Sequence, residues 1–343
     1  MLGLSYIILL MLIAVFCYLI APDNTPNADL QTVEIQAKEP GFTQLFIKLK
    51  NRQPQHKNLF SVLWSGQPDY NTWMPIKSYT VSGNDLIVQH YIDEDTSETI
   101  RLDLKKVAGP QHNLSQVLVR KKYWLGTDLL GRDILSRLLI GTRVSLSVGC
   151  LALLVAMLLG VVIGAIAGYY RGKTDALLLW LINVSWSIPT LLLVFALSIA
   201  MGKGLMQIYI AVGLTLWVSV ARLVRGQMIQ IREREYIQAA KIMGLSNFNI
   251  IFKHAVPNMM GPLIVSATNI FATAIIIEAG LSFLGLGVQS PQPSWGLMIK
   301  ENYNFIITHK PILAIIPGLA IMLLVLAFNM VGNGWRDALD VKG

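Results

Sequence analysis

Six long apolar stretches constrain the fold of this sequence more than any other feature. A helix needs roughly 20 mostly apolar residues to cross a lipid bilayer. The stretches that approach this length are residues 4–21, 144–169, 177–201, 205–221, 263–284 and 312–331. Their order predicts an all-α polytopic membrane protein with six transmembrane helices. A long polar segment, residues 22–122, separates the first helix from the second.

Composition favours a membrane protein over a soluble one. Charged residues make up 14% of the chain and hydrophobic residues 54%, whereas about one quarter of an average soluble domain is charged. The net charge of +8 does not indicate nucleic-acid binding, because the basic residues flank the apolar stretches and form no common face. Cys17 and Cys150 both lie inside apolar stretches, so we expect small buried hydrophobic residues rather than a disulfide or a metal pair.

The orientation of the spans follows from the Lys and Arg residues, which favour cytoplasmic loops. If the loop between the fourth and fifth spans is cytoplasmic, ten such residues lie in inward loops and three in short outward loops. The inward ten are Arg171, Lys173, Arg222, Arg225, Arg232, Arg234, Lys241, Lys253, Arg336 and Lys342, and the outward three are Lys203, Lys300 and Lys310. This distribution predicts a multi-pass protein of the cell membrane with a cytoplasmic amino terminus and an extracytoplasmic segment 22–122. No basic residue precedes the first span, so we expect a retained anchor rather than a signal peptide.

The polar segment 22–122 shows the period of β-strands. Aliphatic side chains recur at every second position in 45–49 and 99–104, and residues 93–98 read as a hairpin turn after 86–92. We therefore expect a small β-rich extracytoplasmic insertion without catalytic chemistry. Its histidines lack the spacing of metal ligands: His56, His90 and His112. The chain then divides into residues 1–21, 22–122 and 123–343.

Two features of the spans concern helix geometry. Small residues recur at every fourth position of the second span and predict close packing along one face. They are Ala152, Ala156, Gly160, Gly164 and Gly168. Pro189 removes a backbone donor from the third span and is expected to kink or break it.

Polar residues within the spans are candidates for lining a translocation path. Asn183, Ser185 and Ser187 lie about one turn before Pro189, where they either line a path or bond the carbonyls freed by the kink. Glu278 is the sole carboxylate in the fifth span, and a charged residue in a span indicates function. Because it lies near the predicted outer end, it could instead reach water or pair with a basic residue. The candidate pore-lining residues are Asn183, Ser187 and Glu278.

One segment resembles a phosphate-binding loop but fails its requirements. Residues 168–174, GYYRGKT, place three residues between their glycines, whereas a P-loop needs four and follows a strand. No other glycine-rich loop offers the amides that phosphate requires, so we do not expect the chain to bind ATP itself. The spans also lack a Ser/His, His/Glu or paired-Asp constellation, so we expect neither an enzyme nor a cofactor or metal site.

The polar segment between the fourth and fifth spans, residues 233–257 and here called the bracket, is predicted to form two helices joined by a bend. A first helix runs from residue 233 and ends before Gly244. Ser246 or Asn247 can cap a second helix. We expect it to run to Pro257, whose ring ends the regular bonding and re-aims the chain into the fifth span. One face of the first helix carries Tyr236, Ala239, Ala240 and Met243. Small residues at its centre suit a helix that docks into a groove of another protein.

Gln238-Ala239-Ala240 in this bracket, with Gly244 and then Val256-Pro257, resembles a family motif. Permease subunits of binding-protein-dependent ABC importers, of the dipeptide/oligopeptide class, carry E-A-A-x-x-x-G followed by a hydrophobic-Pro pair. Gln238 replaces the Glu of that motif. The resemblance extends to LGTDLLGRD (125–133), REREY (232–236), LSFLGLG (281–287), PSWG (293–296) and RDALD (336–340). It covers residues 125–342 and leaves out the β-rich insertion.

The resemblance implies the fold of a type I ABC importer permease that forms half of a translocation path for short peptides or similar small solutes. It implies that a cytoplasmic loop, residues 222–257, docks as a coupling helix into separate ATP-binding subunits. The implied coupling residues are Glu235, Tyr236, Gln238, Ala239, Ala240, Gly244 and Pro257. The other implied partners are a second homologous permease and an extracytoplasmic solute-binding protein, besides the lipid bilayer. Similar members carry nickel, which leaves a non-peptide solute as an alternative.

Other function classes fit the sequence less well. An ion channel or secondary transporter is expected to show a charged or carbonyl-lined filter, or broken helices in inverted halves, and the sequence shows neither. A receptor anchored in the membrane has no need of six spans and a structured cytoplasmic segment.

Overall fold

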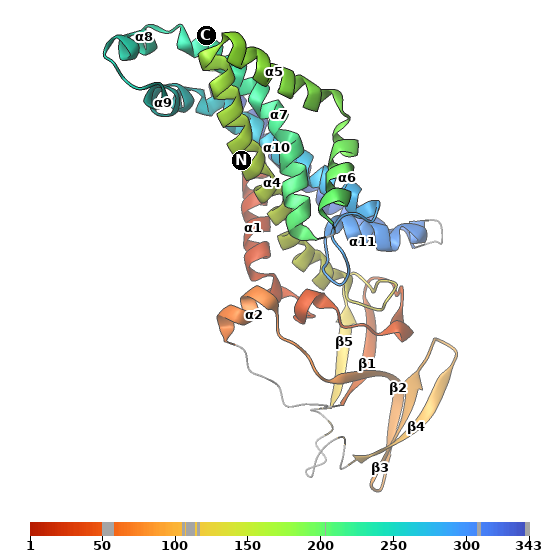
Figure 1. The fold of residues 1–343 in the computed structure, drawn as a ribbon. Helices are drawn as coiled ribbons and strands as arrows, with labels where there is room; N and C mark the ends of the chain where they lie inside the picture. Colours follow the sequence, from red (N-terminus) through yellow and green to blue (C-terminus); the bar gives the residue numbers. More distant parts are fainter. Residues whose placement is uncertain are drawn as a thin grey trace.

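Long helices form most of the computed structural model, which describes residues 1–49, 58–104, 107, 114, 117–202, 204–306 and 310–339. The long helices are α1 Leu2–Ile20, α4 Ile134–Tyr170, α5 Gly172–Ser187, α6 Thr190–Met201, α7 Leu205–Arg232, α10 Met260–Phe283 and α12 Ile312–Leu339 (Figure 1). The short ones are α2 Leu59–Ser65, α8 Glu235–Ile242, α9 Asn247–Asn249 and α11 Trp295–Asn302. Single turns are η1 Pro26–Ala28, η2 Val33–Ile35, the π-helical η4 Ile250–Ala255, η5 Val256–Met259 and η6 Tyr303–Ile306. Outside the described residues lie His56, His112, Lys203, Asp340 and Lys342.

The predicted spans are confirmed as helices. Among the described residues, five helical segments are long and apolar enough to cross a membrane, and α5 with α6 makes a sixth if this bent pair is one span. In α4 and α7, which extend beyond their apolar stretches, polar side chains hold the added turns. α4 begins at Ile134, and Asp133 caps it: the Asp133 carboxylate accepts a 2.9 Å hydrogen bond from the Ser136 N–H. α7 continues to Arg232, and on the way Arg225 pairs with Asp175 of α5 at 2.6 Å.

The third span is broken at Pro189, as its sequence indicated. α5 and α6 meet there at an angle of 93°. Ser187 Oγ donates a 2.7 Å hydrogen bond to the Val184 carbonyl, one of the groups that the end of α5 leaves unpaired. Pro189 then precedes the first turn of α6 with a φ of −54°, close to the value that its ring sets in advance.

The β-rich insertion is one five-stranded antiparallel sheet in the order β4-β3-β2-β1-β5. Its strands are β1 Phe42–Leu49, β2 Thr72–Ser82, β3 Asp85–Tyr91, β4 Ser97–Asp103 and β5 Leu118–Tyr123. The predicted turn between β3 and β4 is confirmed, and Asp93 Oδ1 accepts from the N–H groups of Asp95 and Thr96 at 2.9 and 2.6 Å. Periodicity did not reveal β2 and β5, because β2 contains Pro75 and half of the residues of β5 are basic.

Apolar side chains cover both faces of the sheet. Ile47, Ile76 and Leu86 belong to one buried cluster, and Phe46 and Tyr123 belong to another. Because neighbouring residues of a strand point to opposite faces, Phe46 and Ile47 mark the two sides of β1. This explains why Phe46 occupies a position of β1 where strict alternation of apolar and polar residues would place a polar one.

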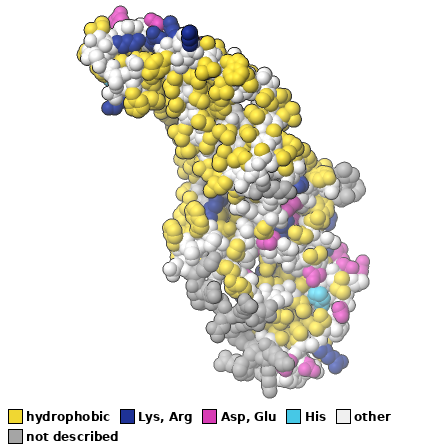
Figure 2. All heavy atoms as spheres, in the orientation of Figure 1, with side chains coloured by type: hydrophobic (Ala, Val, Ile, Leu, Met, Phe, Trp, Pro, Cys, Tyr) yellow, Lys and Arg dark blue, Asp and Glu magenta, His cyan; other side chains and the backbone are white. Residues whose placement is uncertain are grey.

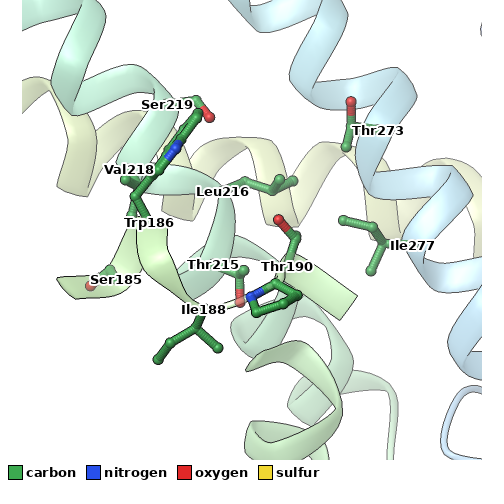
Figure 3. Close-up of a pocket in the computed structure, with 11 residues that line it drawn as sticks. Ser185, Trp186, Ile188, Thr190, Thr215, Leu216, Val218, Ser219, Thr273 and Ile277 are labelled. Carbon is green, nitrogen blue, oxygen red and sulfur yellow. The ribbon is translucent and has the colours of Figure 1, made fainter. Parts of the chain in front are cut away.

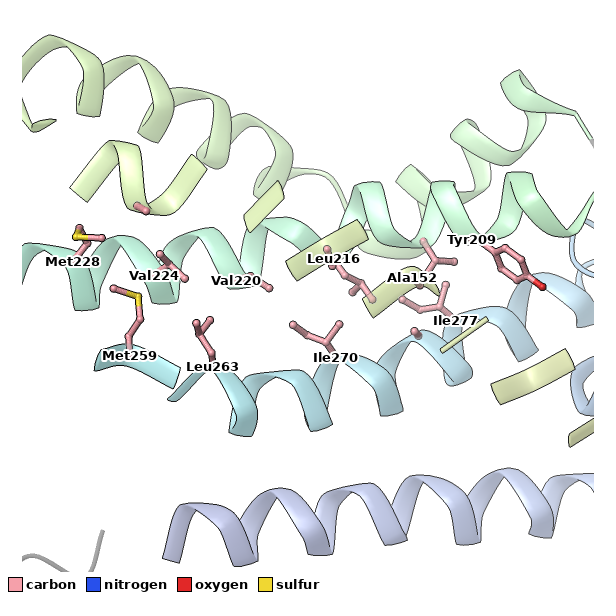
Figure 4. Packing of buried hydrophobic residues seen from close by; sticks show 14 of the residues in the cluster. Ala152, Tyr209, Leu216, Val220, Val224, Met228, Met259, Leu263, Ile270 and Ile277 are labelled. Atoms are coloured by element: carbon pink, nitrogen blue, oxygen red, sulfur yellow. The ribbon is translucent and has the colours of Figure 1, made fainter. Parts of the chain in front are cut away.

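The small-residue stripe of α4 is confirmed as a packing surface against α7. A Cβ added at Gly160 would lie 2.3 Å from Val220 Cβ, and one at Gly164 would lie 2.5 Å from the Ala221 carbonyl oxygen. Figure 4 shows Val224 and other side chains of α7 meeting side chains of α10. α7 therefore packs against both of its neighbours along most of its length.

The bracket and the sheet lie at opposite ends of the helical bundle (Figure 1). Hydrophobic side chains cover the middle of the bundle, and Lys and Arg gather at the bracket end (Figure 2). Cys17 is buried as expected, but the expectation is wrong for Cys150, which is exposed on α4. One side of a spanning helix can face lipid, so an apolar stretch does not by itself bury every residue in it.

Candidate functional site

The first helix of the bracket is α8, and it begins later than the sequence suggested. Glu233 still belongs to the end of α7, because its N–H donates to the Gln230 carbonyl. At the other end, the N–H of Gly244 bonds the Lys241 carbonyl and that of Leu245 bonds the Ala240 carbonyl, at 3.0 and 3.2 Å. This is a Schellman ending, which needs a left-handed residue, and Gly244 has a φ of +78°. The predicted bend at this glycine is confirmed.

The second helix of the bracket runs directly into a membrane span. Ser246 caps it, its hydroxyl accepting from the Asn249 N–H at 3.4 Å. The helical run then continues from Asn247 to Phe283 through α9, η4, η5 and α10. The regular α-helical bonding is interrupted around Pro257, as expected, but the chain stays helical and runs on into the span. A wider π-helical turn precedes Pro257, and a change of hydrogen-bond spacing accommodates the proline ring without breaking the helix.

The two faces of α8 differ from the single face that the sequence suggested. Ala240 and Ile237 are buried in the same apolar cluster as Ile250 of η4. This cluster holds the two arms of the bracket together. Tyr236 and Ala239 are exposed. The outer face of the bracket, as we call it, consists of Tyr236, Ala239, Ile242, Met243 and Phe248, all exposed. Glu235 is exposed too, and Gln238 Nε2 donates a 3.1 Å bond to the Arg232 carbonyl.

Tyr169, at the end of α4, ties the bracket to the spans. Its hydroxyl donates to Asn247 Oδ1 at 2.8 Å, and its carbonyl accepts from Arg232 Nη1 at 2.6 Å. Lys241 Nζ lies 5.2 Å from the centre of its ring. Partial burial, and then the nearby charge of Arg232, lower the pKa of Lys241. Sequence reasoning missed Tyr169, although it lies in the GYYRGKT segment, which the structure shows as the turn between α4 and α5.

A hollow of about 330 Å³ opens beside the break between α5 and α6. Side chains from this break, from α7 and from α10 converge on it (Figure 3). Its lining residues are Ser185, Trp186, Ile188, Pro189, Thr190, Thr215, Leu216, Val218, Ser219, Thr273 and Ile277. The wall is thus a mixture of hydroxyl-bearing and apolar side chains and carries no formal charge.

A second hollow, of about 590 Å³, lies nearer the bracket along the same two helices. Its lining residues are Leu223, Gly261, Pro262, Val265, Ser266, Asn269 and Arg336. On α7, Thr215, Ser219 and Leu223 follow at every fourth position, so one helix face joins the two hollows. On α10, Asn269 and Thr273 continue this line. We call this joined surface the α7–α10 lane.

The three residues suggested as pore-lining do not line either hollow. Asn183 Oδ1 accepts a 2.8 Å bond from Arg222 Nη2, and Ser187 bonds its own helix. Glu278 is fully buried and accepts a 2.7 Å bond from Ser282 Oγ, so it pairs with a hydroxyl rather than with water or a basic side chain. Ile277 faces the hollow instead. A role of these three residues in the path of an assembled transporter stays a prediction.

A buried ionic cluster holds the opposite end of α4, within the LGTDLLGRD segment. Arg132 is 1% exposed and reaches Asp128, Asp29 and Glu301 at 2.7, 3.3 and 2.8 Å. Arg137 shares Glu301 at 2.9 Å. Asp29 comes from the segment after α1, and Glu301 comes from α11. The cluster therefore joins three parts of the chain that lie far apart in the sequence.

Residues 160–342 match the family model described as "Binding-protein-dependent transport system inner membrane component". The chain belongs to this family. The match includes the bracket and the helices of the α7–α10 lane. It confirms the resemblance that the motifs indicated, and this permease is a transmembrane subunit of an ABC importer. The family model does not reach α1 or the sheet.

Curated relatives agree with this family. The permease is 41% identical to the oligopeptide transport system permease protein OppC of Bacillus subtilis, over 65% of this chain and 72% of the relative. It is 44% identical to the dipeptide permease protein DppC of Alkalihalophilus pseudofirmus, over 64% and 72%. It is 42% identical to the glutathione permease protein GsiD of Pectobacterium atrosepticum, over 64% and 73%. Among solved structures, the inward-facing MetNI methionine ABC transporter is similar at 18% identity with a TM-score of 0.47, covering 58% of this chain and 96% of that one.

Proposed function

We propose that this permease forms half of the translocation path for short peptides and couples it, through the bracket, to a separate cytoplasmic ATPase. The observation that carries the coupling is the outer face of the bracket: apolar side chains exposed at the end of a rigid helical projection. The peptide assignment rests on relatives at 41–44% identity that are named for oligopeptide, dipeptide and glutathione transport. These names favour peptides over the nickel alternative.

The coupling residues we propose are Glu235, Tyr236, Gln238, Ala239 and Gly244, with Met243 and Phe248 added from the structure. Ala240 and Pro257 act indirectly, because the first holds the two arms together and the second lies where the bracket enters α10. A cleft of an ATP-binding subunit that closes around the outer face would move α7, α10 and α4 as one body. Such rigid-body switching is a common route from ligand binding to a change of conformation.

The α7–α10 lane supports a path for a polar, flexible solute. A peptide backbone presents both donors and acceptors, and the hydroxyls of Ser185 and Thr190 can serve as either. The Thr273 hydroxyl donates to the Asn269 carbonyl and can accept a further bond. Apolar neighbours such as Leu216 and Ile277 let a solute slide without binding too tightly. The open side of the lane calls for a second homologous permease, which would supply the other half of the wall.

The topology we propose places the bracket in the cytoplasm and the sheet outside the cell membrane. Two features support it: the bracket and the sheet lie at opposite ends of the spans, and Lys and Arg gather at the bracket end (Figure 2). The chain then consists of a first span (1–21), an extracytoplasmic module (22–122) and a permease domain (123–343). The outer position suits the module for contact with a solute-binding protein or with the second permease.

A crosslinking experiment tests the coupling. Met243→Cys, in a Cys150→Ser background, is expected to crosslink to the ATP-binding subunit in purified complex, while Thr80→Cys on the sheet does not. Uptake of a labelled tripeptide into proteoliposomes should depend on ATP and on the binding protein. A Met243→Cys thiol that stays as reactive toward maleimide in the active complex as in the isolated permease would contradict the docking role. If Met243→Cys still crosslinks to the ATP-binding subunit but the complex takes up no tripeptide, only the peptide assignment would be contradicted.

A further inference from the structure

The short helix α2, at the sheet end of α1, carries an exposed apolar face. Leu59, Phe60 and Trp64 are 71%, 80% and 75% exposed. A helix advances about 100° per residue, so these three side chains and Leu63 share one arc. Ser61 and Ser65 lie on the other side and bond backbone carbonyls at 3.0 and 2.9 Å. Exposed apolar faces of this kind mark contact with a partner or a membrane.

One arginine sets the depth of α2 along the bundle. Arg143 of α4 donates to the carbonyls of Ala14 and Val15 in α1, at 2.9 and 3.1 Å. The same guanidinium donates to the carbonyls of Leu63 and Trp64 in α2, both at 2.9 Å. The end of α2 therefore lies beside the last turns of the apolar helix α1.

The position of the Arg143 contact along α1 shows how far α2 lies from the end of that helix. α1 continues from Val15 to Ile20, and a helix rises about 1.5 Å per residue, so the end of α2 lies roughly 8 Å inside the end of α1. The exposed apolar side chains of α1 at the same level are Val15, Phe16, Leu19 and Ile20. The face of α2 therefore lies at the level of apolar side chains that α1 also exposes.

The contacts around α2 hold it firmly in this position. The N–H of Gln67 donates to the Asn24 carbonyl at 2.9 Å. Gly66 lies so close to Tyr18 that an added Cβ would come within 2.8 Å of the ring. Arg143 lies over the ring of Tyr18 and the ring of Trp64, at 5.5 and 5.6 Å. The partly exposed guanidinium is satisfied by carbonyls and rings, as a charge near lipid must be.

We propose that α2 is an interfacial membrane anchor, whose Leu59, Phe60 and Trp64 insert into the headgroup boundary of the leaflet on the sheet side. Trp and Phe beside aliphatic residues suit this boundary, where short amphipathic helices lie in the membrane plane. The occupant is lipid rather than the second permease, because α1 packs on α4 and α12 and the α7–α10 lane belongs to other helices. The anchor ties the sheet to the bilayer at a fixed tilt, whatever the solute.

Fluorescence quenching in the assembled transporter tests this anchor. Phe60→Cys, in a Cys150→Ser background, is labelled with the fluorophore NBD after reconstitution of the full complex into nanodiscs, and Thr80→Cys on β2 is the matched control. We expect 5-doxyl phosphatidylcholine to quench the label at position 60 at least threefold more than the label at position 80. Iodide in the buffer should show the opposite order. Trp64→Cys provides a second position should Phe60→Cys assemble poorly.

Two results would overturn the proposal. If iodide reaches the label at position 60 as readily as at position 80, α2 lies in water. If neither quencher reaches it, another protein covers the face, and the second permease becomes the partner to identify. The quenching measurement needs no transport. Uptake by the same purified complex in liposomes tests the proposed function separately, so a failure of one proposal is distinct from a failure of the other.

Discussion

The hydroxyl of Tyr169 donates a 2.8 Å hydrogen bond to Asn247 Oδ1, which joins the last turn of α4 to the second arm of the bracket. α4 is 37 residues long, and its far end is held by the ionic cluster around Arg132. If the bracket moves as proposed, α4 is the single helix that would carry this movement from one side of the bundle to the other.

Tyr169→Phe should weaken this transmission without removing the aromatic ring that Lys241 and Arg232 contact. The lost hydrogen bond is worth about 1 kcal/mol, or roughly a fivefold shift of an equilibrium. We expect ATP hydrolysis to persist while peptide uptake per ATP falls severalfold in proteoliposomes. Tyr170→Phe, at the exposed neighbouring ring, is the matched control. Equal uptake per ATP in the two variants would remove Tyr169 from the coupling route.

Gly244→Val should abolish association with the ATP-binding subunits, whereas Gly244→Asn should retain most of it. No atom lies within 4 Å of a Cβ added at this position, so the space is open and the cost comes from the backbone. A left-handed conformation costs a β-branched residue roughly 1–2 kcal/mol or more, and Asn tolerates it. Co-purification of the subunits measures the effect. If the two variants behaved alike, the left-handed bend would not be the property that matters.

Gly164→Leu should separate α4 from α7 and lower the thermal stability of the complex. An added Cβ already lies 2.5 Å from the Ala221 carbonyl oxygen, and overpacking typically costs about 1–3 kcal/mol. Gly226→Ala is the control, because no atom lies within 4 Å of its added Cβ and Ala favours a helix. Differential scanning fluorimetry in detergent should show a lower midpoint for the first and an unchanged or higher one for the second.

Glu301→Ala should destabilise the fold strongly, because it leaves Arg132 and Arg137 buried without a shared carboxylate. Removing one partner of a buried ion pair costs about 3–5 kcal/mol. Glu94→Ala removes the partner of Lys38 in an exposed pair and should leave the melting midpoint unchanged. The same instrument compares the two variants, and equal midpoints would mean that solvent reaches the cluster.

The stability of the sheet should rise with pH above neutrality. Burial lowers the pKa of Lys121 to about 8, against about 10.4 in an unfolded chain. Between these values the unfolded state binds more protons, so stability increases with pH by up to about 1.4 kcal/mol per unit. Lys121→Met should flatten this slope and Lys122→Met, at an exposed position, should keep it. A flat profile in the unmodified protein between pH 8 and 10 would refute the shift.

Sequence periodicity determined the features that depend on short stretches of chain. Length and apolar content predicted the spans, Pro189 predicted the break of the third, the spacing from Ala152 to Gly168 predicted the contact with a second helix, and Gly244 predicted the bend. Each of these follows from the backbone preference or the size of residues within a few turns.

The tertiary structure alone decided which side of each element faces protein. It turned Ala240 inward, placed Ser185 rather than Ser187 at the hollow, and buried Glu278. It also brought Asp29, Arg132 and Glu301 together and laid α2 beside the last turns of α1. These relations depend on contacts between segments tens to hundreds of residues apart, and a local pattern carries no information about which distant segment will cover a given face.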